Sequence, residues 1–202
     1  MKKDCGFTLL ELIVVMAIGA ILTVLAVPPM ITALQDNRLT TQMNQIAGLL
    51  TYARKEAVSR RTTVSACATS NGAACNTVNW EAGILIFVGD AATTPTPAAA
   101  DTLKVIGDLS DQITIRRQSN TDVVPAGFNN GYLRFSGSGM IESSDAGSFK
   151  ACDDRGATEG RGLIINGIGQ IRGATDSDND GTVEIIFKNL LTALTDTEAT
   201  CF

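Results

Sequence analysis

The stretch that decides the fold is GFTLLELIVVMAIGAILTVLAVPP, residues 6–29. From Phe7 to Val27 it is apolar for 21 residues, with Glu11 as its single charge. A helix rises about 1.5 Å per residue, so this run spans about 30 Å, the thickness of the hydrocarbon core of a bilayer. Two lysines precede the run, and the positive-inside rule keeps that end in the cytoplasm. The stretch therefore predicts a single-pass membrane helix, with the rest of the chain outside the cytoplasm.

A secretory signal peptide and a plain signal anchor are two other interpretations of this run. The signal peptide fits badly, because the run is long for its apolar core and no Ala-x-Ala site in a polar context follows it. The plain anchor leaves Glu11 unexplained, since an acid inside a membrane helix costs about 2.5–3.5 kcal/mol. We therefore expect Glu11 to have a functional partner.

The sequence Gly6-Phe7-Thr8-Leu9-Leu10-Glu11-Leu12-Ile13 resembles the processing site of type IV prepilins and of type II secretion pseudopilins. The resemblance implies that a prepilin peptidase cuts after Gly6 and methylates the new amine of Phe7. It also implies that Glu11 is the acid used in assembly. In a membrane, the carboxylate of Glu11 and the Phe7 amine of a neighbouring subunit are each costly alone, so their pairing would favour docking in register.

This resemblance divides the chain into three parts. Residues 1–6 would be the cleaved leader, 7–29 the transmembrane and filament-core helix, and 30–202 the periplasmic globular domain. We expect the partners to be other pilins, bound through the N-terminal helix.

The same helix is predicted to continue to about Ser59. Pro28 and Pro29 interrupt it, and because proline lacks a backbone donor we predict a bend or local melting near Pro28. Beyond the prolines, apolar residues recur at three- and four-residue steps, which indicates an amphipathic helix packed on a core. The residues of this stripe are Leu39, Met43, Ile46, Leu50, Ala53 and Ala57.

After the helix the apolar period shortens to two, which is typical of strands. Asn166-Gly167 predicts a tight hairpin, and Gly89–Asp101, rich in Ala, Thr and Pro, an exposed loop. One long helix packed on a mostly antiparallel sheet is an α+β fold. The predicted strands are Thr63–Ala68, Ile84–Val88, Thr102–Ile106, Ile113–Arg117, Tyr132–Phe135, Gly162–Asn166, Ile168–Arg172 and Thr182–Phe187.

Composition limits the function. The 202 residues are 45% hydrophobic and 18% charged, enough for one globular domain besides the N-terminal segment. The net charge of -5 argues against general nucleic-acid binding. The chain has no histidine, so Ser-His and Cys-His nucleophile pairs and imidazole metal sites cannot exist. With no other catalytic constellation, we expect a protein that is not an enzyme.

Four cysteines remain once Cys5 is removed with the leader: Cys67, Cys75, Cys152 and Cys201. They allow three pairings. The short spacing of Cys67 and Cys75 suggests a local loop staple, and the other two would then tie down the C-terminal tail. Zinc is the alternative, although no CxxC pair and no histidine support it. We expect disulfides and an oxidising compartment, and the pairing stays open.

Five segments in three regions of the body resemble the GspH/FimT-type minor pilins. They are the helix end 53–61 leading to Cys67, the segment 80–87 after Cys75, and the segments 135–139, 161–163 and 169–172 with the closing Cys201. The resemblance implies a structural subunit that primes pilus assembly near the tip. A minor pseudopilin of a type II secretion system is the alternative. Trp80 in the second segment is expected in the core, against the Cys67–Cys75 staple.

Two further patterns suggest ligands. Asp176, Asp178 and Asp180 before Gly181 look like the start of a calcium loop, but Phe187 stands where an EF-hand places its glutamate, so a solvated acidic turn is preferred and no cofactor is expected.

The second pattern is Gly169-Gln170-Ile171-Arg172. Some members of the branch bind DNA in natural transformation through a Gly-Arg-x-Arg stretch, of which only Arg172 is matched here. A basic patch would need help from Arg116, Arg117, Arg155 and Arg161. We prefer ordinary surface arginines to a DNA site.

Overall fold

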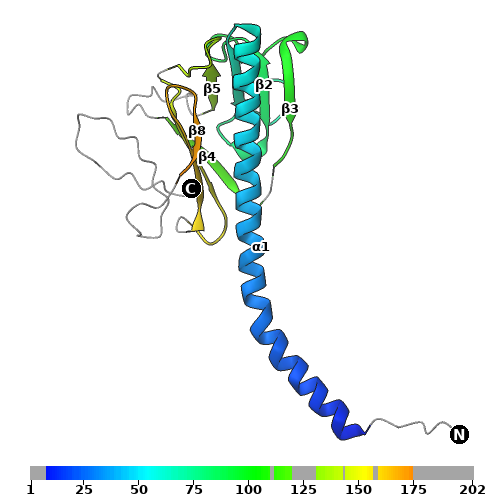
Figure 1. The fold of residues 1–202 in the computed structure, drawn as a ribbon. Helices are drawn as coiled ribbons and strands as arrows, with labels where there is room; N and C mark the ends of the chain where they lie inside the picture. The colour runs from blue at the N-terminus through cyan, green and yellow to red at the C-terminus, as the bar shows by residue number, and fades with distance from the viewer. Residues whose placement is uncertain (1–7, 110–111, 120–130, 143, 157–158, 175–202) are drawn as a thin grey trace, which may run out of the picture. The chain divides into compact units, whose positions relative to one another are not determined.

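The computed structural model describes residues 8–109, 112–119, 131–142, 144–156 and 159–174 (Figure 1). The chain divides into two compact units, Met1–Arg38 and Leu39–Phe202. The first unit contributes the N-terminal part of a long helix. The second contains the rest of that helix, both sheets and the core.

Helix α1 runs from Leu9 to Arg60, within two residues of the predicted span. It begins because the hydroxyl of Thr8 accepts a hydrogen bond from the backbone N–H of Glu11, at 3.2 Å, which caps the first turn. It ends where Arg61 adopts a left-handed φ of 53°. The N–H of Thr62 then donates to the carbonyl of Ala57 at 3.3 Å, as in a Schellman end.

The predicted break or local melting of the helix at Pro28 and Pro29 is not observed, because α1 is continuous through both residues, while the predicted bend stays a prediction. A proline ring removes one donor and crowds the carbonyl four residues earlier, but its own φ is close to helical. The turns on both sides can therefore keep the helix in register. Within the described parts of the chain, none of the helices combines the length and the apolar character that a bilayer crossing needs.

The first sheet has the strand order β3-β2-β1-β5, and every pairing is antiparallel. The registers are fixed by pairs such as Ala66 with Ile86 and Ala66 with Leu133. The four strands confirm the predicted ones, to within one residue. They are β1 (Val64–Ala68), β2 (Ile84–Val88), β3 (Thr102–Ile106) and β5 (Tyr132–Phe135).

The second sheet has the order β4-β6-β7-β8, again with antiparallel pairs. Strand β6 was not predicted, because its buried Ser148 and Lys150 hide the apolar alternation of Phe149 and Ala151. The predicted strand 182–187 lies outside the described residues. The strands of this sheet are β4 (Thr114–Ser119), β6 (Gly147–Cys152), β7 (Arg161–Ile165) and β8 (Ile171–Gly173).

The hairpin between β7 and β8 is longer than predicted. Its turn runs from Asn166 to Gln170, closed by hydrogen bonds from the N–H of Gly169 and of Gln170 to Asn166, both at 2.8–2.9 Å. Gly169 supplies the left-handed φ of 75° that this turn requires. Ile168, predicted to lie in a strand, is instead an exposed turn residue.

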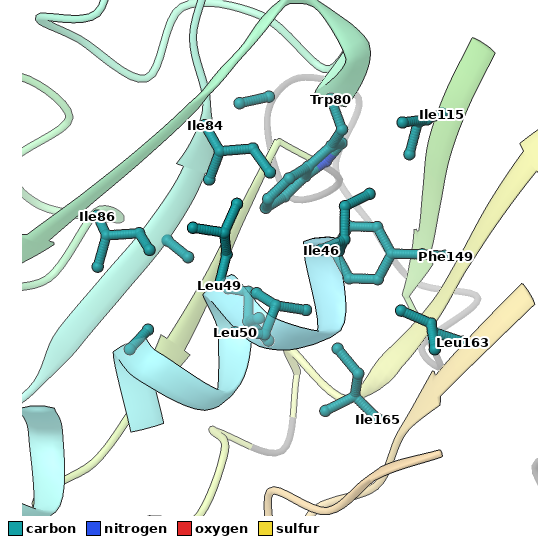
Figure 2. Close-up of a cluster of buried hydrophobic side chains, with 14 of the residues drawn as sticks. Ile46, Leu49, Leu50, Trp80, Ile84, Ile86, Ile115, Phe149, Leu163 and Ile165 are labelled. Carbon is teal, nitrogen blue, oxygen red and sulfur yellow. The ribbon is translucent and has the colours of Figure 1, made fainter. Parts of the chain in front are cut away.

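The main core lies where α1 meets both sheets (Figure 2). Ile46, Leu49 and Leu50 of the helix point between the isoleucines of β2 and the side chains of the second sheet. The predicted helix stripe is confirmed, since Leu39, Met43, Ile46, Leu50, Ala53 and Ala57 are all buried.

Trp80 lies in the short 3-10 helix η1 (Trp80–Ala82), and a second one, η2, spans Ala99–Asp101. Trp80 is fully buried as predicted, whereas the disulfide that it was predicted to pack against belongs to a different buried cluster. Its ring meets Phe149 of β6 edge-on, with centroids 4.7 Å apart, and it belongs to the main core. Cys67 points to the opposite face of the first sheet, because successive strand residues alternate between faces.

Candidate functional site

The start of α1 places the predicted assembly acid. Glu11 lies exposed in the first helical turn, where the partial positive charge of the helix end favours a carboxylate. Thr8, which caps this turn, was missed in the sequence, although Thr8-x-x-Glu11 matches a capping box. Gly6 and Phe7 lie outside the described residues.

The first unit carries apolar side chains around the helix. Its large apolar residues are exposed by 47–75% where described, with Leu9, Leu10, Met16 and Met30 the most open. A helix that is apolar on all sides belongs in a membrane or in a larger core. An exposed apolar surface of this extent is typical of an interaction site.

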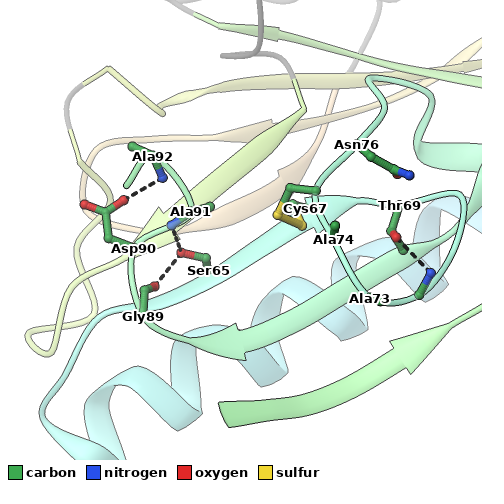
Figure 3. Close-up of a disulfide and its surroundings, with 12 residues drawn as sticks. Ser65, Cys67, Thr69, Ala73, Ala74, Asn76, Gly89, Asp90, Ala91 and Ala92 are labelled. Carbon is green, nitrogen blue, oxygen red and sulfur yellow. Dashed lines mark hydrogen bonds between the residues drawn. A yellow bond between two sulfur atoms is a disulfide. The ribbon is translucent and has the colours of Figure 1, made fainter. Parts of the chain in front are cut away.

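The predicted staple is confirmed: Cys67 and Cys75 form a disulfide, with Cα atoms 5.5 Å apart (Figure 3). Cys67 is buried with Leu85, Phe87 and Ala91 in a second, smaller cluster on the face of the first sheet away from the main core. The disulfide holds the loop between β1 and η1 over this face. Cys152 is also disulfide-bonded, and its predicted partner Cys201 lies outside the described residues.

The stapled loop is reinforced by polar side chains. Asn71 accepts hydrogen bonds from the backbone N–H groups of Ala73 and Ala74 at 3.0 and 3.1 Å. The N–H of Cys75 donates to the carbonyl of Pro95 at 2.8 Å, which links the loop to the predicted exposed loop that follows β2. The buried hydroxyl of Ser65 also anchors that second loop, by accepting from the N–H of Ala91. The two loops therefore form one cover for the second cluster.

A buried acid joins the two sheets. Asp145, 2% exposed, accepts hydrogen bonds from Nε of Arg134 at 2.7 Å and from Nη2 of Arg134 at 3.1 Å. The guanidinium of Arg117, on β4, donates to the backbone carbonyl of Asp145. Arg134 also contacts Asp90 after β2, at 3.2 Å. The charges of the two arginines are thus balanced by two carboxylates.

Burial and charge act in opposite directions on this cluster. Burial lowers the pKa of Arg117 to about 10, although the nearby Asp145 opposes the change. The hydrogen bond to Asp145 raises the pKa of Arg134 above its ordinary value. Both arginines are therefore cationic at neutral pH, and the cluster is a structural link with no exposed reactive group.

Arg54 of α1 brings together segments of the chain that resemble the minor pilins. Its Nε donates to the carbonyl of Gly139 and its Nη2 to the carbonyl of Ile168, both at 2.9 Å. The turn after β5 and the β7–β8 turn are thereby held on the C-terminal end of the helix. Similarly, Glu81 of η1 pairs with Arg116 of β4 at 2.6 Å.

Several of the arginines suggested for a basic patch are buried or paired within the domain. Arg116 and Arg117 are consecutive on β4, and Arg117 is 3% exposed. Arg155 pairs with Asp153 at 2.8 Å. Arg172 is exposed on β8 and donates to the side chain of Gln170 at 2.7 Å.

The acidic stretch with Asp176, Asp178 and Asp180 lies outside the described residues. Among the residues that the structure does describe, no group of acids and cysteines is placed to hold a metal ion.

Comparison with known proteins supplies the family. The family model described as Type II transport protein GspH matches residues 42–169, more than half of the chain. This chain belongs to the GspH family. The model for the prokaryotic N-terminal methylation motif matches residues 1–27 of the same GspH-family chain. The family comprises minor type IV pilins and pseudopilins, which are structural subunits that assemble with other pilins.

Solved structures agree on the fold. The type IV minor pilin FimU of Pseudomonas aeruginosa PAO1, in its P21 crystal form, aligns with a TM-score of 0.54 over 70% of this chain and 91% of its own, at 24% identity. The P65 form gives 0.50 over 68% and 93%, at 23% identity. At this identity the likeness concerns the fold alone. No match is found among curated proteins.

Proposed function

We propose that this GspH-family chain is a minor type IV pilin that helps to prime pilus assembly, near the tip. The observation that carries the proposal is the exposed apolar N-terminal unit with one acid in its first turn. Burying such a surface against similar helices would stabilise a filament by roughly 25 cal/mol for each Å² removed from water. The role is structural, and the protein is not an enzyme.

Before assembly, the same helix would anchor the chain in the inner membrane. The apolar sequence from Phe7 to Val27 supports this anchor, and the two lysines before it place the domain in the periplasm. A prepilin peptidase would cut after Gly6 and leave N-methylated Phe7 at the new terminus. The matching methylation motif over residues 1–27 supports this processing.

Mass spectrometry of the mature N-terminus tests the class of protein directly. We expect the exported chain to begin with methylated Phe7. A mature chain that begins at Met1, or well beyond Pro29, would rule out a shared N-terminal helix.

Glu11 tests the assembly mechanism. In Glu11→Ala, and equally in Glu11→Gln, we expect normal peptidase cleavage and a loss of incorporation into filaments, since neither side chain can pair with the amine of a neighbour. Glu142→Gln is the matched control, because Glu142 is an exposed acid of the globular unit. Immunoblots of sheared filaments and of membranes measure the two effects. Wild-type incorporation of Glu11→Gln would contradict the pairing mechanism.

Two alternative functions would use the same N-terminal helix. If the protein is a minor pseudopilin of a type II secretion system, its deletion should reduce protein secretion, whereas deletion of a minor pilin should reduce the number of pili. A DNA-binding minor pilin would retard DNA in a gel, through Arg172. We expect the soluble domain not to retard DNA, because Arg117 is buried and Arg116 and Arg155 are each paired with an acid. Retardation that Arg172→Ala abolishes would contradict this expectation.

A further inference from the structure

We propose that the C-terminal end of α1 and the two turns packed on it form a docking surface for an acidic face of a neighbouring pilin subunit. This surface, called here the Met140 surface, consists of Lys55, Val58, Arg61, Met140 and Ile168. The proposal rests on the proposed function, since it specifies how the globular unit meets its neighbour.

Three large apolar side chains are exposed at this place: Val58 by 48%, Met140 by 52% and Ile168 by 62%. They come from the helix, the turn after β5 and the β7–β8 turn. The two turns are adjacent, because the N–H of Ile141 donates to the carbonyl of Gly167 at 3.0 Å. Exposed apolar residues that gather in this way, rather than singly, mark an interaction site.

The surface is pre-formed. Arg54 fixes both turns through the carbonyls of Gly139 and Ile168. Gly139 and Gly169 have left-handed φ values of 79° and 75°, and a Cβ at Gly139 would approach Cγ2 of Val58 to 2.8 Å. The turns therefore lie close against the helix. A partner that binds a fixed surface loses little free energy in ordering it.

Positive charge indicates the chemistry of the partner. Arg60 donates to Glu56 at 2.7 Å, but among the described residues the exposed side chains of Lys55 and Arg61 contact no acid and donate to no other polar group. A partner surface with carboxylates beside apolar side chains would pair with these two cations and cover the exposed apolar side chains. Nucleic acid fits less well, because phosphate contacts use the cations and leave Val58, Met140 and Ile168 in water.

Photo-crosslinking in cells tests the contact. A photoreactive amino acid replaces Met140 in the full chain, and Val105, which is exposed by 43% on β3 away from the surface, serves as the matched control position. We expect an adduct at position 140, identified by mass spectrometry as a pilin-type subunit, and none at position 105. No adduct at 140, equal adducts at both positions, or an adduct with nucleic acid would overturn the proposal.

A charge reversal tests whether the Met140 surface is needed for incorporation into filaments. Met140→Glu combined with Arg61→Glu should lower incorporation into filaments by about tenfold, the effect of losing one strong interface contact. Val105→Glu should leave incorporation unchanged, and thermal melts of both variants verify folding. If wild type enters filaments and the two variants behave alike, the surface is wrong while the proposed function stands. If wild type never enters filaments, the proposed function fails, and a pilin adduct at position 140 would still support the contact.

Discussion

Asp145 is a polar residue whose loss should destabilise the protein strongly. It connects a strand of each sheet, and it balances two arginines that are largely removed from water. Removing one partner of a buried ion pair leaves an uncompensated charge, which costs more than the pair contributes. The position would be hard to find in the sequence, where Asp145 is one acid in a loop.

We expect Asp145→Asn to lower the free energy of unfolding by about 3 kcal/mol, because Arg134 loses its charged acceptor in a site that is only partly open to water. Urea unfolding of the purified chain measures the change. Asp101→Asn, at an exposed acid in η2, provides the control. A loss no larger than that of the control would show that the cluster is not a stabilising link.

The carboxyl group of Asp153 should make the stability of the protein depend on pH. Burial is the largest influence and would raise its pKa, but hydrogen bonds from the side chain and backbone of Arg155 together lower it below the ordinary value. A lowered folded pKa gives stability that is present above the unfolded pKa of about 3.9 and is lost as pH falls through the folded value. Asp153→Asn should therefore lose less stability than wild type between pH 7 and pH 3. An identical acid loss in both proteins, measured by thermal melts, would refute this.

At the scale of elements, the loop between β1 and η1 depends on its disulfide. The cover that it forms lies over Leu85 and Phe87, which would otherwise meet water on the outer face of the first sheet. Sequence indicated the staple from the spacing of two cysteines. It could not show which face of the sheet the staple covers, since that depends on the register of β1 with β2.

We expect Cys67→Ala with Cys75→Ala to destabilise the chain by about 2.5 kcal/mol, the chain-entropy effect of closing a loop of this length. The same variant should expose the second cluster and bind a fluorescent hydrophobic dye. Denaturant unfolding in the absence of reductant keeps the disulfide of Cys152 intact. An unchanged unfolding midpoint would mean that the hydrogen bonds of the loop suffice.

At the scale of the whole molecule, the chain combines an apolar unit made for burial with a domain that carries its own core. Whether Asp176, Asp178 and Asp180 bind calcium stays a prediction. Calcium bound there would change the stability of the complete domain. We expect calcium and a chelator to give the same melting temperature, since the twelfth loop position holds Phe187 in place of a glutamate. A rise with calcium that Asp178→Asn removes would contradict this expectation.

Sequence patterns alone were enough to predict the long helix, its apolar stripe, seven of the eight described strands and the local disulfide. These features depend on periodicity and spacing, which are local. The methylation motif could be found in the sequence for the same reason, since it lies within a few consecutive residues, and the assembly role of Glu11 in that motif stays a prediction. Strand β6 was not predicted because a buried lysine and serine interrupt its alternation of apolar residues. The β7–β8 turn was predicted too short because Gly169 lengthens it.

Contacts between residues from distant segments could be found only in the folded structure. The hydrogen bonds of Arg54 to Gly139 and Ile168 join segments that lie up to 114 positions apart in the sequence. Asp145 joins two sheets, and Trp80 lies on Phe149 and away from the disulfide. Such contacts follow from how the helix and the two sheets pack, and packing is a property of the whole chain that no short stretch of sequence encodes.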